Sequence, residues 1–361
     1  MAKILFKHFK DIEGNVVNFR LEDKEITVAE NLEPMANEVI IDGHYQKYIS
    51  NGWIDIHTHC LDKFELYGDK IDEIGYKQGV TCVVDAGTCG SDDFEEFLQQ
   101  ANASKTKAYS WLNIAKCGIA YQNELADLSL IDKNAIAKTL EKHRHKIIGL
   151  KVRMSRSVVK ESKDEPLYIA LDLANEFKLP LMVHIGNPPS LIETVMENVR
   201  CGDIVTHIFN PKENSVLDKM GKVKKEVFEA KQRGVLFDLG HGTESFGFNT
   251  CKSSLSQGLM CDTISSDIYF HNRLEGPVYC LADVMSKMVE VGYSLKEVID
   301  MVTIKPKQYL HLPTEACDFT IFEVRDDDTT GIDSIGVQQQ LHQHIVATAV
   351  IIDGEYIELE G

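Results

Sequence analysis

Short apolar runs alternate with longer amphipathic segments through the middle of the sequence. Each run has the composition of a buried strand, and the segment after it is long enough for a helix. The eight runs start at residues 53, 80, 109, 147, 181, 203, 235 and 263. This rhythm predicts an α/β fold, a (β/α)8 TIM barrel over residues 53–313.

A doubly wound open sheet is the competing α/β architecture. That fold carries a glycine-rich phosphate-binding turn after its first strand. Here the first run is followed by His57-Thr58-His59 and no such turn, so the barrel is favoured.

The two ends of the chain show a different pattern. Residues 1–52 alternate apolar and polar positions in short runs with turn signals such as Asp42-Gly43, which is typical of a β unit. Residues 314–361 show the same alternation. Because the apolar faces of both ends need a partner, we expect both termini to build one small β-sandwich subdomain.

Composition narrows the function classes. The 38 Lys and Arg against 56 Asp and Glu give a net charge of −18, which argues against nucleic acid or an anionic membrane as a partner. The longest apolar stretch, residues 345–352, is too short to span a bilayer. The first residues contain no long apolar run of the kind that a secretory signal has. The whole sequence has 9 cysteines and no CxxC pair, so we expect reduced thiols in a cytoplasmic protein.

Residues that can bind a metal close several of the predicted strands. Active sites of such barrels lie at the C-terminal ends of the strands. His57 and His59 are two residues apart in an extended strand, so both imidazoles point to the same side. Each residue alone has an ordinary structural explanation, but their joint occurrence indicates a metal site. The full set is His57, His59, Lys151, His184, His207 and Asp267.

The order HxH, Lys, His, His, Asp over a barrel with a split β-sandwich resembles the amidohydrolase superfamily. Four segments are similar to its amidohydrolase/deacetylase metallohydrolase branch, which is related to dihydroorotases. These segments are Gly149–Ser155, His184–Pro189, His207–Asn210 and Asp238–Gly242.

The resemblance implies a binuclear zinc centre. One ion would be bound by His57, His59 and Asp267, and the other by His184 and His207. Lys151 would bridge both ions after CO2 converts its neutral amine to a carbamate with two oxygen donors. Zn²⁺ suits these ligands, and Mn²⁺, Fe²⁺ and Co²⁺ are alternatives.

Such a centre implies a hydrolase. A hydroxide between the two ions would attack an amide or ester carbonyl, and Asp267 would pass its proton to the leaving group. Cys89, after the second strand, is a weaker alternative to Lys151 as the bridging ligand. The expected function is deacylation or deacetylation of a small molecule.

Five residues after the strands are candidates for substrate binding. Arg153 and Arg156 follow Lys151 and are expected to bind a substrate carboxylate through their guanidinium groups. His241 lies between two glycines after the seventh strand. His271 and Arg273 lie in the loop after Asp267 and are weaker candidates.

Other functions stay open at this point. A cyclic amide hydrolase resembling dihydroorotase is the first alternative. An aminohydrolase resembling adenine deaminase is disfavoured, because those enzymes use a glutamate-centred proton relay that this sequence lacks. A non-catalytic scaffold is disfavoured, because all six metal-site residues are present. Barrels of this family are commonly oligomeric, so we expect a homo-oligomer.

Overall fold

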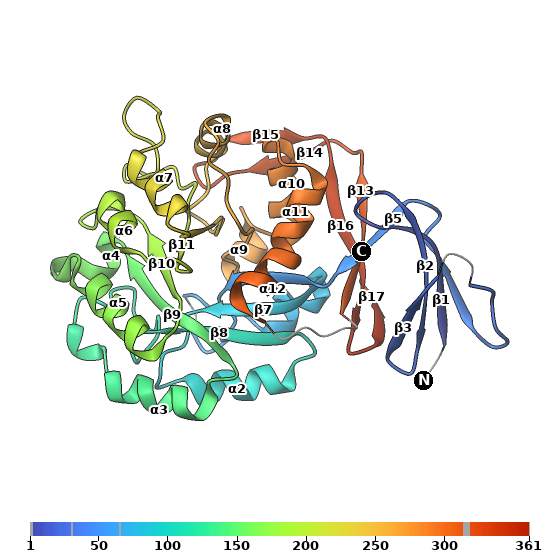
Figure 1. The fold of residues 1–361 in the computed structure, drawn as a ribbon, viewed down its shortest axis with the longest axis horizontal. Coiled ribbons are helices and arrows are strands. Elements are labelled where there is room, and N and C mark those ends of the chain that lie inside the picture. The colour runs from blue at the N-terminus through green and yellow to red at the C-terminus, as the bar shows by residue number, and fades with distance from the viewer. Residues whose placement is uncertain (1–2, 30–31, 65, 313–317, 361) are drawn as a thin grey trace.

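The larger part of the molecule is a parallel sheet of seven strands that pair in chain order (Figure 1). The fold comes from a computed structural model that describes residues 3–29, 32–64, 66–312 and 318–360. Each strand begins within two residues of an apolar run, which confirms the expected parallel sheet. The strands are β6 (Trp53–Thr58), β7 (Val80–Ala86), β8 (Lys107–Asn113), β9 (Ile147–Met154), β10 (Leu181–Ile185), β11 (Ile204–Thr206) and β12 (Leu236–Asp238).

The eighth apolar run closes this sheet without forming a regular strand. It makes one parallel bridge to each edge of the sheet, Asp238 to Thr263 and Thr58 to Ile268. Two buried carboxylates accept hydrogen bonds from the serines between these bridges, so those groups do not form a regular ladder. The eight segments therefore surround one barrel interior.

Helices connect the strands and cover the outside of the barrel (Figure 1). Short 3-10 turns lie at Tyr76–Gln78, Leu128–Leu130 and Lys160–Ser162. The α-helices are α1 (Ile71–Ile74), α2 (Phe94–Ala103), α3 (Lys133–His143), α4 (Arg156–Val159), α5 (Glu165–Phe177), α6 (Ile192–Asn198), α7 (Lys225–Gln232), α8 (Phe248–Ser256), α9 (Phe270–Glu275), α10 (Leu281–Val291), α11 (Leu295–Val302) and α12 (Ile304–Leu310). Within the described ranges, no helix is long and apolar enough to cross a bilayer.

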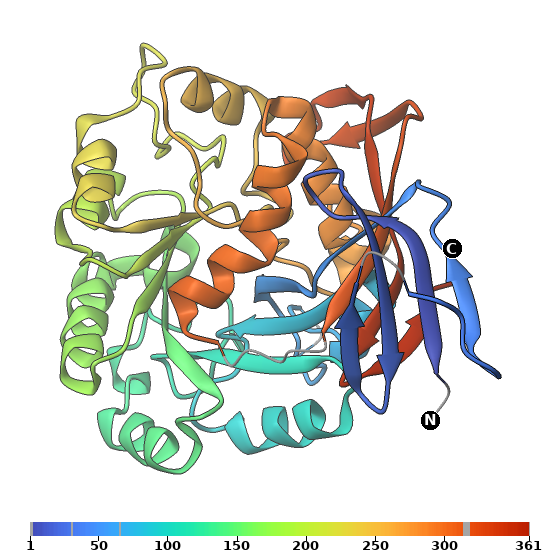
Figure 2. The same ribbon diagram turned by 45° about the vertical axis from the view of Figure 1, so that its right-hand side comes forward.

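Both termini contribute strands to a second sheet at one side of the barrel (Figures 1 and 2). Its central strand pair joins the two ends of the chain, since Thr320 lies opposite Ser50 in an antiparallel ladder. A separate hairpin is formed by β14 (Thr329–Ile332) and β15 (Gln338–Leu341). The sheet strands are β1 (Ile4–Lys10), β2 (Val16–Glu22), β3 (Glu25–Val28), β4 (Val39–Asp42), β5 (Lys47–Asn51), β13 (Phe319–Arg325), β16 (His344–Ile352) and β17 (Glu355–Glu358).

Three apolar clusters hold these parts together. The largest fills the space between the barrel strands and the helices, and a second fills the barrel interior around Trp111 and Met182. The third lies on the terminal sheet around Phe6 and Phe19, whose rings stack 4.3 Å apart. The eight described cysteines are free thiols, and Cys317 lies outside the described residues, as does the expected boundary at residue 314.

Candidate metal centre

A cavity of about 120 Å³ lies at the C-terminal ends of the barrel strands. Five of the six expected metal ligands line it, and the sixth, His207, lies directly behind, with its ring centre 4.4 Å from that of His184. The cavity is lined by His57, His59, Tyr67, Lys151, Arg153, His184, Lys212, Thr243, Glu244, Ser245, Asp267 and Tyr269.

The carboxylate of Asp267 joins the two histidines of the first strand. Its Oδ1 lies 3.0 Å from His59 Nε2 and 3.3 Å from His57 Nε2. Donor atoms of His57, His207 and Asp267 all lie within 4.8 Å of one another, a spacing that one metal ion can span. Burial alone would raise the pKa of Asp267, but hydrogen bonding to His59 and the nearby imidazoles lower it below its usual value.

Lys151 lies in β9 between these groups. Its Nζ is 3.3 Å from His57 Nε2 and 3.2 Å from the sulfur of Met182, and its side chain is fully buried. Burial lowers the pKa of Lys151 to about 7, so a neutral amine is accessible near neutral pH. A neutral amine is the form that can react with CO2.

His207 tests whether the site fits a metal. Its Nδ1 lies 2.7 Å from the carbonyl oxygen of Gly240, which accepts a hydrogen bond from the ring. Its Nε2 is buried and has no hydrogen-bond partner among the described residues. A buried lone pair without a donor is costly, and a metal ion would satisfy it. The donor set therefore fits a divalent ion.

Two hydroxyl groups orient the imidazoles of His57 and His59 in the same way. His57 Nδ1 lies 2.9 Å from Thr206 Oγ1, and that hydroxyl donates to Asp238 at 2.7 Å. His59 Nδ1 lies 2.8 Å from Thr88 Oγ1, which in turn donates to Asp85. Because each hydroxyl proton goes to a carboxylate, each Nδ1 donates, and each Nε2 would offer its lone pair to a bound ion.

The backbone near the ligands is shaped for close approach. His207 and Asp267 both adopt the left-handed region, at φ 70° and 53°, which is unusual for residues other than glycine. A Cβ atom on Gly240 would lie 2.8 Å from His207 Nδ1, and one on Gly242 would overlap the Asp267 carboxylate. Glycines at these two positions leave room for the ligands.

The two arginines after Lys151 lie in different surroundings. Arg153 lines the cavity, but its Nε and Nη2 both donate to the buried carboxylate of Glu124, at 2.7 Å each. Its guanidinium also lies 5.7 Å from the centre of the Tyr67 ring. Arg156 is exposed, donates to the carbonyl oxygen of Pro188 and lies outside the cavity wall. Carboxylate binding by either arginine stays a prediction.

The other three candidates do not line the cavity. His241 is buried, and its Nε2 lies 3.2 Å from the equally buried Lys287. His271 is exposed on α9. Arg273 is paired with Asp69 at 2.6 Å. Contacts between these residues and a substrate stay predictions.

Cys89 lies apart from the imidazoles. Its sulfur is 3.6 Å from a carboxylate oxygen of Asp85 and 3.6 Å from the hydroxyl of Ser110. Burial raises the pKa of its thiol well above the usual value, which disfavours the thiolate that a metal needs. The geometry therefore favours Lys151 over Cys89 as the bridging residue.

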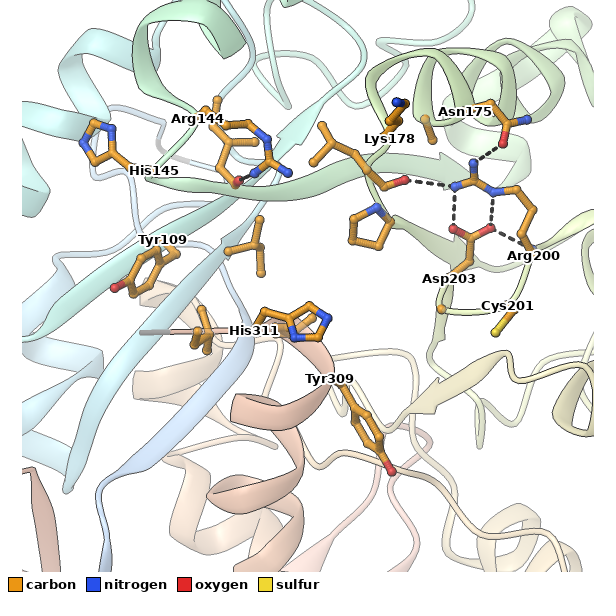
Figure 3. A pocket seen from close by; sticks show the side chains of 18 residues that line it. Tyr109, Arg144, His145, Asn175, Lys178, Arg200, Cys201, Asp203, Tyr309 and His311 are labelled. Carbon is orange, nitrogen blue, oxygen red and sulfur yellow. Dashed lines mark hydrogen bonds and ion pairs between the residues drawn. The ribbon is translucent and has the colours of Figure 1, made fainter. Parts of the chain in front are cut away.

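A larger cavity, of about 850 Å³, opens at the opposite end of the barrel (Figure 3). Arg144, Lys178 and His311 line it, and each is the C-cap residue of a helix. The charges of Arg144 and Lys178 offset the helix dipole at these ends. Arg200 binds Asp203, as the dashed lines in Figure 3 show. Size alone does not make this cavity the reaction site, because within the described ranges the group of side chains that could hold a metal ion lies at the other end.

Several cavity residues have no clear sequence signal. Tyr67, Lys212 and Glu244 line the cavity from loops after three different strands. Glu124 reaches Arg153 across 29 residues of sequence. Only Lys212 has a weak signal in the sequence. It follows His207 by five residues, in the loop after a barrel strand, where substrate-binding residues of such barrels lie.

Comparisons with known proteins identify relatives of this chain. No family model matches the sequence. A protein named deacetylase from Enterococcus faecalis is 38% identical over 364 aligned residues, which cover 98% of both chains. A deacetylase from Brucella anthropi is 31% identical over 345 residues, covering 91% of this chain and 84% of the relative.

Two solved structures share the complete fold. One, described as an adenine deaminase, is 38% identical with a TM-score of 0.93 and covers 99% of this chain and 100% of its own. The other, described as a dihydroorotase, is 29% identical with a TM-score of 0.92 and covers 100% of both chains. The barrel fold and these relatives define a hydrolase of the metal-dependent class. The chain belongs to the amidohydrolase superfamily.

Proposed function

We propose that the protein removes an acyl group, in particular an acetyl group, from a small amide or ester that carries a carboxylate. The observation that carries this proposal is the Asp267 carboxylate within 3.3 Å of both strand-end imidazoles, at the wall of a small cavity. The named deacetylases at 38% and 31% identity support the same reaction.

The metal centre is proposed to hold two divalent ions, most suitably Zn²⁺. His57, His59 and Asp267 would bind one ion, and His184 and His207 the other. Lys151, carboxylated by CO2, would bridge them. The buried amine beside His57 and the unsatisfied Nε2 of His207 support this assignment.

Asp267 is the proposed proton carrier. Bound divalent ions would acidify a water molecule and polarise the acyl carbonyl. The carboxylate of Asp267 faces the cavity, and its lowered pKa keeps it ionised at neutral pH, so it can accept the water proton. The same group then delivers the proton to the leaving nitrogen or oxygen. Tyr67 and Tyr269 lie edge to face at the cavity wall, with ring centres 5.1 Å apart.

The size of the cavity restricts the substrate. Ligand pockets for drug-sized compounds measure about 300–1,000 Å³, whereas this cavity measures about 120 Å³. A short acyl group on a small leaving group fits better than a long-chain or polymeric substrate.

A cyclic amide hydrolase is the second candidate. The dihydroorotase structure at TM-score 0.92 favours it, and the same residues can attack a ring amide. Adenine deamination is a weaker candidate, although one solved structure carries that name. The proposed bridging role of Lys151 supports hydrolysis of an acyl compound over deamination.

A substrate panel tests these alternatives. The zinc-loaded protein would be incubated with N-acetyl amino acids, acetylated hydroxy acids, dihydroorotate, hydantoin and adenine. We expect release of acetate from at least one acetylated acid with a specificity constant at least 100 times that for dihydroorotate or adenine. Turnover of dihydroorotate or adenine without any deacetylation would overturn the proposal.

The remaining expectations on organisation are also proposals. Residues 1–52 and 314–361 are proposed to form the β-sandwich subdomain beside a barrel at 53–313. Tyr356 packs edge-on against Phe6 at 5.4 Å, and the Gly354 backbone lies against Lys24, so the terminal sheet curls back on itself. We further propose a cytoplasmic homo-oligomer that acts on small molecules and binds neither nucleic acid nor membrane.

A further inference from the structure

Besides the histidines, three side chains that line the cavity carry an amine or a guanidinium group, and they differ in their partners. Lys151 lies among the metal ligands. Arg153 is held by Glu124, whose side chain has no exposed surface. Lys212 is the third: its Nζ lies 2.9 Å from Glu244 Oε2.

The partner of Lys212 is easy to replace. The Lys212 side chain is 15% exposed, whereas the Glu244 side chain is 76% exposed. A carboxylate at the surface loses little by returning to water, because exposed ion pairs contribute little. By contrast, separating Arg153 from Glu124 would leave a buried charge without a partner, which is strongly unfavourable.

The chain also holds Lys212 in place at the cavity wall. Its backbone N–H donates to Asn210 Oδ1 at 3.1 Å, and Asn210 donates to the carbonyl oxygen of His207. The loop that carries Lys212 is thereby tied to a proposed metal ligand. A group bound at the ammonium would lie at the same cavity as Asp267 and His184.

We propose that Lys212 binds the carboxylate of the substrate and that this carboxylate replaces Glu244 on its ammonium group. This inference rests on the proposed deacylase function and names its substrate class: small acylated acids with a carboxylate close to the scissile bond. Glu244 is then an internal competitor that occupies the anion site until substrate arrives. Lys212 selects anionic substrates over neutral analogues.

The test compares an acid with its uncharged analogue. The zinc-loaded protein would be assayed with N-acetylalanine and N-acetylalaninamide, and the ratio of their kcat/KM values would be measured. Lys212→Met should lower this acid-to-amide ratio about tenfold or more, because it removes a charge-assisted hydrogen bond. Lys212→Arg should retain most of the ratio, since it keeps the charge.

Lys224 provides a matched control. It pairs with Glu193 at 2.9 Å and is also 15% exposed, but it lies outside the cavity wall. Lys224→Met should leave the ratio within twofold of the parent. Glu244→Gln should lower KM for the acid about two- to fivefold, because the competing carboxylate is gone.

Equal ratios for Lys212→Met and Lys224→Met would overturn the inference. If the parent deacetylates neither compound, the proposed function loses support. The role of Lys212 is then tested separately, by calorimetric measurement of N-acetylalanine binding. Tighter binding to the parent than to Lys212→Met, by about tenfold, would support the anion site. Equal binding, or none to either protein, would contradict it.

Discussion

The two ends of the barrel hold cavities of opposite character. The cavity at the C-terminal ends of the strands measures about 120 Å³, and buried imidazoles, an amine and a carboxylate line or border it. The cavity at the other end measures about 850 Å³ and is bordered by exposed cations such as Arg144 and Lys178 (Figure 3).

The two cavities differ in whether the polar side chains that border them have partners in the protein. At the large cavity, Arg144 and Lys178 lie at helix C-termini, and Arg200 pairs with Asp203. At the small cavity, His207 Nε2 is buried without a partner, and Lys151 is buried with a pKa lowered to about 7. Unsatisfied or perturbed groups at one place indicate chemistry better than cavity volume does.

The largest effect is expected at Asp267. Asp267→Asn should lower kcat by about 10²–10⁴-fold, because an amide cannot accept the proton of the attacking water at neutral pH. At least one ion should stay bound, since the amide oxygen remains a ligand. Steady-state kinetics with metal analysis checks both statements, and near-normal turnover would eliminate the proton-carrier role.

Removal of the proposed bridging residue should have the next largest effect. Lys151→Ala should lose at least one ion, and kcat should fall at least about 100-fold, because even outer partners of metal ligands are worth about 10–100-fold. Added acetate or bicarbonate should restore part of the activity by filling the vacant bridging position. Full turnover with two ions still bound would show that Lys151 does not bridge.

Arg153→Met tests whether Arg153 or Lys212 binds the substrate carboxylate. The substitution leaves Glu124 buried without its partner, so we expect the protein to lose about 3–5 kcal/mol of stability. Activity on N-acetylalanine and on its amide should fall by the same factor. A selective fall for the acid, about ten- to hundredfold, would instead assign carboxylate binding to Arg153.

The smallest effect is expected at the opposite end of the barrel. Lys178→Met should cost about 0.3–1 kcal/mol through the helix dipole of α5 and leave kcat unchanged. Thermal unfolding and kinetics measure both quantities. A loss of turnover comparable to that of Lys151→Ala would mean that the large cavity takes part in the reaction.

The barrel could be predicted from sequence because strand periodicity is a local property. All eight apolar runs are barrel segments, and the run at 263 forms bridges only, since its serines bind buried carboxylates. The proposed metal-site residues could be identified because each lies at or near the C-terminal end of an apolar run, and the geometry of the barrel brings such ends together.

The residues missed by sequence reasoning depend on contacts between distant loops. Glu124 lies 29 residues before Arg153 in a loop without a motif, so the ion pair that engages the guanidinium had no sequence signal. His241 contacts Lys287 from a helix 46 residues later, which explains its position outside the cavity wall. Local patterns cannot predict pairings of this kind.

The central claim is a binuclear hydrolytic centre at the C-terminal end of the barrel. The most direct test measures metal content and activity together. The purified protein would be stripped with a chelator, titrated with Zn²⁺ in the presence of bicarbonate, and assayed for acetate release at each step. The account predicts that stripping abolishes activity and that activity returns as two ions bind per chain. Full activity in the stripped protein would contradict it. So would activity that reaches its maximum while no ion is bound to the protein.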